Sequence, residues 1–262
     1  MLKSWKEKQM IKYAFTIITV CRNSQKTIRN TFESVLNQKN LDKIPLEYIV
    51  IDGNSSDDTV AIIKEFENKF LAKGVAFTWI SEPDQGIYDA MNKGIKKAHG
   101  SYIGILNSDD TYSESALWIV QSEIESGSDA DIYHGIMRYY DGNTLSMVHA
   151  SSSEHLNKGM IEHPTCFVKA AVYKKYGMFD LHYRYVADYD LMIRLKQNDC
   201  RFVLIEEILA NYSENGAGNS YASRKELLKL KRYYKLESLP TLAAMRFKYW
   251  LREWREHRSA LR

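Results

Sequence analysis

The chain has 262 residues, of which 45% are hydrophobic and 26% are charged, and its formal net charge at pH 7 is +3. This length allows one large α/β domain with a full buried core and an elaborated second half. The three cysteines are widely spaced and form no CxxC pair, which excludes a disulfide framework and a zinc site and fits a reducing cytoplasm. No apolar run approaches the roughly 18 residues that a membrane span needs, so a soluble or peripheral protein is expected.

Four apolar runs in the first half of the chain predict buried strands over residues 15–20, 48–51, 75–80 and 102–106. Helical patterns follow the first run, through Leu36, and the second run, over residues 60–70. The alternation of strands and helices predicts a mostly parallel sheet flanked by helices. Because open α/β sheets bind ligands beyond the carboxyl ends of their strands, a site is expected at that edge.

Aspartates come at the ends of predicted strands, at Asp52, Asp84, Asp109, Asp110 and Asp188. Aspartate is a poor strand residue, so its repeated placement there is better explained by a site at the sheet edge than by stability. Each carboxylate is therefore a candidate site residue.

Asp109 and Asp110 are adjacent carboxylates that repel each other unless a cation lies between them. Oxygen ligands favour Mg²⁺ or Mn²⁺, which usually binds through one or two carboxylates together with substrate phosphates. A phosphorylated substrate is therefore implied. The alternative is that the two aspartates only cap a helix that begins near Ser113.

Four segments, in chain order, resemble the family 2 glycosyltransferases, which are inverting enzymes with a nucleotide-sugar donor and a Rossmann-like fold called GT-A. The segments cover residues 19–23, 47–57, 82–94 and 107–110. The resemblance extends from about Phe15 to about Gly218 and implies an enzyme of the bacterial polysaccharide-biosynthesis type.

The resemblance also implies roles for individual residues. The residues expected to bind the nucleotide sugar, with Asp52 accepting a hydrogen bond from the base, are Thr19, Arg22, Asn23, Asp52, Asp84, Asn92, Ser108 and Asp109. Asp109 and Asp110 resemble the DXD-type element that binds Mg²⁺ or Mn²⁺. His163 resembles a position near the metal or the diphosphate, although a histidine before a proline is also often structural.

Asp188 resembles the general base of the family, which usually follows another acidic or hydroxyl residue. Here Ala187 precedes it, so only Asp188 can take that role. The alternative is that Asp188 is a helix N-cap. Asp190 lies two residues further on and is expected to point toward the amides at the start of its own helix.

The chain is expected to divide into a GT-A domain over residues 1–222, with a nucleotide-binding half (about 12–112) and an acceptor-side half (113–222), and a basic helical tail over 223–262. From Arg224 to Arg262 there are 12 Lys or Arg and 4 Asp or Glu, a net charge of 12 − 4 = +8. Pro240 separates helical patterns over 223–236 and 241–260, and the second has a stripe of aromatic side chains. That stripe has three alternative occupants, namely the domain itself, a second copy of the chain in a homo-oligomer, or an anionic membrane surface.

The sequence therefore predicts a metal-dependent, inverting glycosyltransferase that uses a nucleoside-diphosphate sugar, with a UDP-sugar favoured. The expected acceptor is a glycan or a lipid-linked glycan at the cytoplasmic face of a bacterial membrane. A noncatalytic nucleotide-sugar-binding scaffold and a nucleotidyltransferase are the alternatives, and the second normally has a glycine-rich phosphate loop that the segment 21–25 lacks. Nucleic acid binding is not expected, because no known reader motif accompanies the basic residues.

Overall fold

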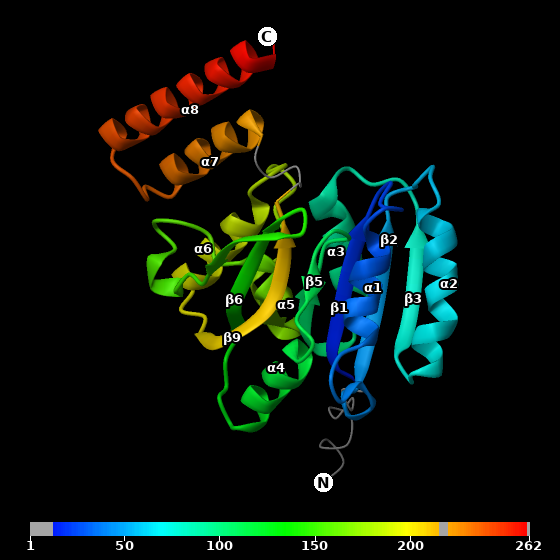
Figure 1. Ribbon diagram of the computed structural model, residues 1–262. Coiled ribbons are helices and arrows are strands. Elements are labelled where there is room, and N and C mark those ends of the chain that lie inside the picture. The colour runs from blue at the N-terminus through cyan, green and yellow to red at the C-terminus, as the bar shows by residue number, and fades with distance from the viewer. Residues whose placement is uncertain (1–12, 215–219, 261–262) are drawn as a thin grey trace.

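The computed structural model describes residues 13–214 and 220–260. Within these residues the strands form one nine-stranded sheet in the order β3-β2-β1-β4-β8-β6-β9-β5, with β7 paired to β6 (Figure 1). The strands are β1 Tyr13–Cys21, β2 Leu46–Asp52, β3 Ala76–Ser81, β4 Gly100–Ile105, β5 Thr111–Tyr112, β6 Ile132–Asp141, β7 Thr144–His149, β8 Phe167–Lys169 and β9 Phe202–Ser213.

The first four strands form the parallel half of the sheet. In β1, β2 and β4 the apolar side chains are buried on both faces, and every residue of β2 is buried, as expected for central parallel strands. All four strands predicted from the apolar runs are confirmed, with ends that differ by at most two residues. The strand order 3-2-1-4 puts the carboxyl ends of β1 and β4 side by side, which is where an open α/β sheet forms a ligand crevice.

Helices cover both faces of the sheet. One face packs against α1 (Ile28–Leu36), α2 (Thr59–Ala72) and α4 (Ala116–Glu125), and residues of these helices share one hydrophobic core. The other face packs against α3 (Ile87–Lys97), α5 (Ala170–Tyr176) and α6 (Ala187–Gln197), whose residues share a second core. Alternate residues of β1 point to the two cores, with Ile17 in the first and Ile18 in the second.

The second half of the sheet is mixed. β8 is antiparallel to both β4 and β6, and β9 is parallel to β6. β5 follows the Asp109–Asp110 pair directly and is antiparallel to β9, with Thr111 opposite Asn211. This pairing brings the end of β9 beside the acidic pair, a proximity that no sequence motif indicates.

Two helices follow the sheet, α7 (Tyr221–Tyr233) and α8 (Leu239–Ala260), and Figure 1 shows them together at one end of the molecule. The predicted break between two tail helices is confirmed, and Pro240 is the second residue of α8, where its missing N–H does not interrupt the helix. Among the described residues no helix combines the length and apolar character that crossing a membrane requires.

α7 packs into the body of the protein. Its Leu230 is completely buried in the second core. The buried ammonium group of Lys231 donates a hydrogen bond to the carbonyl oxygen of Lys158 over 3.0 Å. α8 lies on the outer side of α7, further from the sheet (Figure 1).

Candidate functional site

The loops that follow β1 and β2 are joined by hydrogen bonds. Asn23 has a left-handed backbone with φ of 52°, a conformation that asparagine tolerates better than most residues. Its side-chain oxygen accepts from the backbone N–H of Ser56 over 2.9 Å, and its own N–H donates to Ser55 Oγ over 2.8 Å. Asn23 therefore holds the two loops together, and its predicted contact with a donor remains a prediction.

Asp52 is completely buried at the end of β2. One carboxylate oxygen accepts from Ser55 N over 3.0 Å and from Ser81 Oγ over 2.6 Å. Its other oxygen accepts from Ser55 Oγ over 2.5 Å. These bonds connect the ends of β2 and β3, so Asp52 shapes the floor of the site.

Gly53 lies beneath Asp84, which follows β3. A Cβ atom at Gly53 would lie 2.3 Å from Asp84 Oδ2, so only glycine allows this close approach. The other oxygen of Asp84 accepts from Gly86 N over 2.9 Å at the start of α3. Asp52 and Asp84 are thus brought together at one edge, as the sequence predicts.

Two of the predicted donor-binding residues point inward. The Thr19 hydroxyl is buried and lies 2.8 Å from the Tyr48 hydroxyl. Asn92 is buried and makes two hydrogen bonds with the backbone of Phe179, of 2.9 and 3.0 Å. Both side chains stabilise the protein beneath the site, whereas Arg22 is exposed beside it.

The acidic pair lies at the end of β4, with Asp109 partly exposed and Asp110 completely buried. Asp110 accepts from Ser213 N over 3.2 Å and from Asn107 Nδ2 over 3.3 Å. Burial raises the pKa of both carboxyl groups, and the neighbouring charge of Asp109 raises that of Asp110 further. The alternative capping role is wrong, because α4 begins only after its N-cap Ser115.

The acidic pair has further polar neighbours. Asn107 Oδ1 is buried and has no hydrogen-bond partner among the described residues. The hydroxyl of Ser108 lies 2.8 Å from that of Ser24, which joins the end of β4 to the loop after β1. The pair therefore lies in a polar recess whose uncompensated acceptors favour a cation.

A cavity of about 340 Å³ opens beside Asp109. It lies between the start of α1 and the ends of β6 and β9, and it is lined by Thr27, Asn30, Asp109, Thr111, Arg138, Tyr140, Gly142, Asn211, Tyr212 and Ser213. Arg138 and Tyr212 were missed in the sequence analysis. They reach the site through the pairing of β6 with β9, for which the sequence has no local signal.

Asp188 lies in the first turn of α6 and is partly exposed. Its Oδ1 accepts from the Tyr88 hydroxyl and from Tyr189 N, both over 2.9 Å. Asp188 is not the N-cap residue of α6, which is Val186. Tyr88 was also missed as a site residue. Burial, followed by the charge of Asp188, raises the pKa of its hydroxyl.

Tyr212 lines the cavity beside Asp109. Burial, and then the charges of Asp110, Asp109 and Asp188, raise the pKa of its hydroxyl to about 12. The acidic pair and Asp188 come from segments far apart in the sequence. The site thus has an acidic pair, of which Asp110 is buried and Asp109 partly exposed, and a separate, partly exposed carboxylate, Asp188.

The predicted orientation of Asp190 is wrong. Its carboxylate is buried, forms an ion pair with Arg194 over 2.7 Å, and accepts over 2.7 Å from the hydroxyl of Tyr234, the residue that follows α7. Asp190 therefore holds α6 against α7 and does not bond the amides at the start of its own helix.

His163 is buried, and burial lowers the pKa of its imidazole although the charge of Asp188 opposes that shift. Its ring makes an edge contact with Phe179, with ring centres 5.7 Å apart.

In residues 13–214 and 220–260, no three His, Cys, Asp or Glu side chains form a group that could hold a metal ion. The predicted set of Asp109, Asp110 and His163 is therefore not assembled, and the acidic pair stands as a two-carboxylate candidate.

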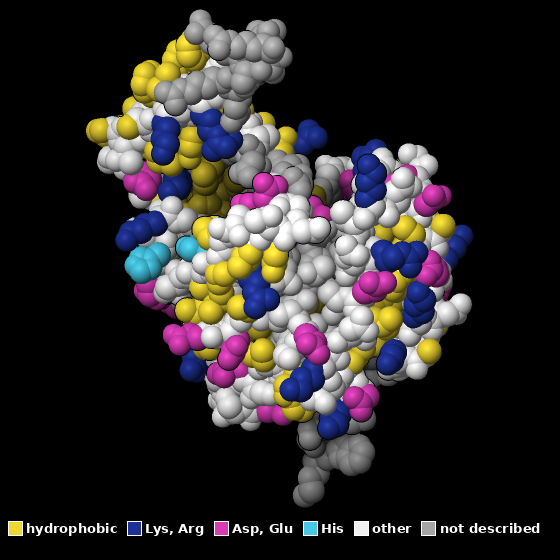
Figure 2. Space-filling view, in the orientation of Figure 1, with side chains coloured by type: hydrophobic (Ala, Val, Ile, Leu, Met, Phe, Trp, Pro, Cys, Tyr) yellow, Lys and Arg dark blue, Asp and Glu magenta, His cyan; other side chains and the backbone are white. Residues whose placement is uncertain are grey.

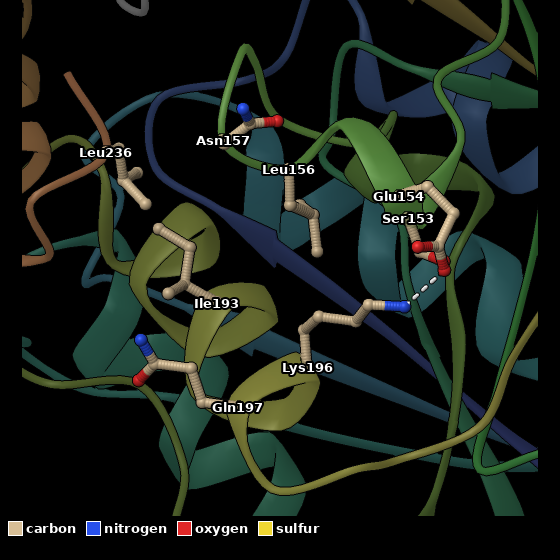
Figure 3. A pocket seen from close by; sticks show the side chains of 8 residues that line it. All are labelled: Ser153, Glu154, Leu156, Asn157, Ile193, Lys196, Gln197 and Leu236. Carbon is tan, nitrogen blue, oxygen red and sulfur yellow. Dashed lines mark hydrogen bonds and ion pairs between the residues drawn. The ribbon is translucent and has the colours of Figure 1, made fainter.

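A second cavity, of about 270 Å³, lies on the outer side of α6 and is shown in Figure 3. Leu156, Ile193 and Leu236 contribute its apolar lining, and Lys196 forms an ion pair with Glu154 at its rim. No predicted site residue lines it.

Comparisons with known proteins agree with this architecture. A sequence model described as glycosyl transferase family 2 matches residues 16–183. An uncharacterized glycosyltransferase of Mycobacterium tuberculosis is 30% identical over 209 residues, which cover 78% of this chain and 76% of that protein. A PGL/p-HBAD biosynthesis glycosyltransferase of Mycobacterium bovis is 28% identical over 222 residues, covering 82% of each chain.

Solved structures share the fold at low sequence identity. Staphylococcus aureus TarS in complex with UDP-GlcNAc aligns with a TM-score of 0.67 and 16% identity, covering 82% of this chain and 65% of that one. A mannosyltransferase of Pyrobaculum calidifontis, in complex with GDP-Man and Mn²⁺, aligns with a TM-score of 0.63 and 14% identity, covering 90% and 70%. This chain thus spans just under two thirds of the TarS chain.

Proposed function

Because the chain belongs to glycosyl transferase family 2, we propose that it is an inverting enzyme that moves a sugar from a nucleoside-diphosphate sugar, with UDP favoured, to an acceptor hydroxyl. The observation that carries this proposal is that two acidic groups from separate elements lie beyond the carboxyl ends of the parallel strands. Asp110 follows β4 and accepts from Ser213 N, and Asp188 accepts from Tyr88 in the first turn of α3, which follows β3. Sugar transfer needs one group that stabilises the departing diphosphate and a second group that takes the proton of the attacking hydroxyl.

The donor would lie along the ends of β1, β2 and β4. Asp52 and Asp84 form the end of this crevice for the nucleoside, as the resemblance implies. The cavity beside Asp109 is lined by Arg138, and Arg22 is exposed at the loop after β1. Guanidinium groups at these two positions can pair with the oxygens of a diphosphate.

Asp109 and Asp110 fit a divalent cation of the Mg²⁺ or Mn²⁺ class. Two carboxylates with raised pKa values and the unpartnered Asn107 Oδ1 are hard oxygen donors in one recess. Such a cation, when bound, offsets the negative charge that grows on the departing nucleoside diphosphate. The Mn²⁺ in the solved mannosyltransferase complex supports this proposal.

Asp188 would act as the general base. Tyr88 and the amide of Tyr189 hold Oδ1, which leaves Oδ2 without a hydrogen bond among the described residues. Oδ2 can take the proton from an acceptor hydroxyl as its oxygen attacks the anomeric carbon from the face opposite the diphosphate, so the configuration inverts. A positioned base of this kind contributes roughly a hundred- to ten-thousand-fold.

The proposed acceptor is a glycan or a lipid-linked glycan of a bacterial surface, modified at the cytoplasmic face of the membrane. The similarity to a PGL/p-HBAD biosynthesis glycosyltransferase supports an acceptor of this kind.

A thermal-shift panel of UDP-, GDP-, TDP- and CMP-sugars, with and without Mn²⁺, tests the donor. We expect one nucleotide sugar to raise the melting temperature, with a larger shift in the presence of Mn²⁺. Release of UDP from that donor in the presence of acceptor extracts then tests turnover. Stabilisation without any turnover would favour the scaffold, and release of pyrophosphate from a nucleoside triphosphate and a sugar phosphate would favour the nucleotidyltransferase.

A further inference from the structure

We propose that α8 binds an anionic lipid surface and holds the protein at the membrane face. Four large side chains form a stripe on α8, at Leu239, Phe247, Trp250 and Trp254, and 68%, 61%, 50% and 44% of them are exposed. Together with Ala243 they recur at intervals of three or four residues, which puts them on one side of a helix. This outer stripe is a continuous apolar surface along most of α8.

The opposite side of α8 already has a partner. Leu242 is buried, and Met245 and Tyr249 are partly buried. The packing of α8 is thus satisfied on its inner side, where it lies against α7 (Figure 1). The outer stripe is not needed to hold the helix in place.

Basic side chains are spread around α8, and helical spacing puts Arg246 next to the outer stripe and Lys248 and Arg252 on other sides of the helix. Arg246, Lys248 and Arg252 are exposed, and Glu253, the only acidic side chain described on α8, is partly buried. In Figure 2 hydrophobic and Lys or Arg side chains gather together over the two tail helices at the upper left. Residues 239–262 contain 6 Lys or Arg and 2 Asp or Glu, a net charge of 6 − 2 = +4.

The net charge of this segment distinguishes between two partners for the outer stripe, a second copy of the chain and an anionic lipid surface. A second copy of α8 packed on the stripe would bring two segments of net charge +4 together, which opposes that association. An anionic lipid surface instead accepts aromatic rings between its headgroups and attracts the net positive charge of the segment. Because α8 has 22 residues, it extends for about 33 Å and can lie along such a surface.

Binding of α8 to a lipid surface would also determine where the candidate site lies relative to that surface. β3 and β9 point toward the end of the molecule where α7 and α8 lie (Figure 1). α7 is tied to α6, the helix of Asp188, by the bond between Tyr234 and Asp190. The tail would therefore hold Asp188 near the lipid surface, where a lipid-linked acceptor is presented. This last step rests on the proposed function, whereas the binding surface does not.

Co-sedimentation of the full chain with vesicles tests the proposal. We expect binding to vesicles of phosphatidylcholine with 30% phosphatidylglycerol, weak binding to phosphatidylcholine alone, and weakening with salt. The Phe247→Ser/Trp250→Ser variant should lose at least about ten-fold in binding, and so should Arg246→Gln/Lys248→Gln. The matched controls are Leu71→Ser on α2 and Lys96→Gln/Lys97→Gln on α3, at exposed sites away from the tail.

Stabilisation by the nucleotide sugar, measured on the same variants, shows that each one is folded and reports on the donor site separately. Unchanged vesicle binding by the two α8 variants would overturn the proposal. So would absence of binding by the parent chain, or a dimer in light scattering that the Phe247→Ser/Trp250→Ser variant abolishes while vesicles bind neither protein. Loss of donor stabilisation with intact vesicle binding would instead count against the proposed function alone.

Discussion

Oδ1 of Asp188 accepts two hydrogen bonds, whereas Oδ2 accepts none from the described residues. We expect Asp188→Asn to lower the rate of sugar transfer by roughly a hundred- to ten-thousand-fold, because an amide cannot take the acceptor proton. Binding of the donor should be unchanged, because Tyr88 can still donate to the amide oxygen. Single-turnover transfer and donor titration measure the two effects. The matched control is Asp199→Asn, at an exposed residue shortly after the same helix. Near-normal transfer by Asp188→Asn would show that Asp188 is not the general base.

Asp110 is a buried carboxylate whose ionised form is costly in the absence of a cation. We expect Asp110→Asn to raise the melting temperature of the metal-free protein at pH 7 by about 2 to 4 °C, and to abolish the additional stabilisation by Mn²⁺. The amide fits, since it can accept from Ser213 N, and Asn107 can turn its unpartnered Oδ1 toward the new N–H₂ group. Differential scanning calorimetry with and without Mn²⁺ and donor measures both. A variant that keeps the full response to Mn²⁺ would reject the metal role.

At the scale of elements, α7 holds the segment that leads into the Asp188 helix. The carboxylate of Glu226 accepts from the backbone N–H groups of Arg184, Tyr185 and Val186 over 2.9, 2.6 and 3.1 Å. Three N–H donors on one carboxylate fix where α6 begins. Glu226 is thus a positioning residue for Asp188, and no pattern in the sequence distinguishes it from other charged residues on the same helix.

Glu226→Gln removes the charge and keeps the shape of the side chain. We expect kcat to fall about ten-fold or more, since charge-assisted hydrogen bonds contribute about 1.5 to 3 kcal/mol, while the dissociation constant for the donor stays the same. Steady-state kinetics together with donor titration measure this split. Glu207→Gln, at an exposed position on β9, should change neither quantity. A loss of donor binding equal to the loss of kcat would indicate a general defect of folding.

Local sequence patterns predicted some of these elements and contacts but not others. The four parallel strands could be predicted because each is an apolar run, which in β1, β2 and β4 is buried on both faces. The orientation of Asp190 could not, because its partner Tyr234 lies 44 residues away, directly after α7. Thr19 and Asn92 lie within segments that resemble the family, but their contacts with Tyr48 and Phe179 depend on tertiary packing.

At the scale of the whole molecule, the two tail helices differ in what they contribute to stability. We expect a chain that ends after Ser238 to keep its melting temperature within about 4 °C, because Leu242 is the only buried side chain described on α8. A chain that ends after Ser220 should be destabilised severely, since it loses the buried residues Leu230 and Lys231 and the cap by Glu226. Thermal unfolding of the two truncated chains measures the difference, and equal stability would contradict the packing of α7 into the body.

The sequence by itself determined the parallel half of the sheet, the edge at which the site lies, and the family. Local apolar patterns and short motifs are enough for these, because each depends on residues that are neighbours in the chain. The tertiary structure alone decided that Tyr212 and Arg138 join the acidic pair, that Tyr88 holds Asp188, and that α7 braces the Asp188 helix. These contacts join residues far apart in the chain, so they exist only once β6 pairs with β9 and the helices pack on the sheet.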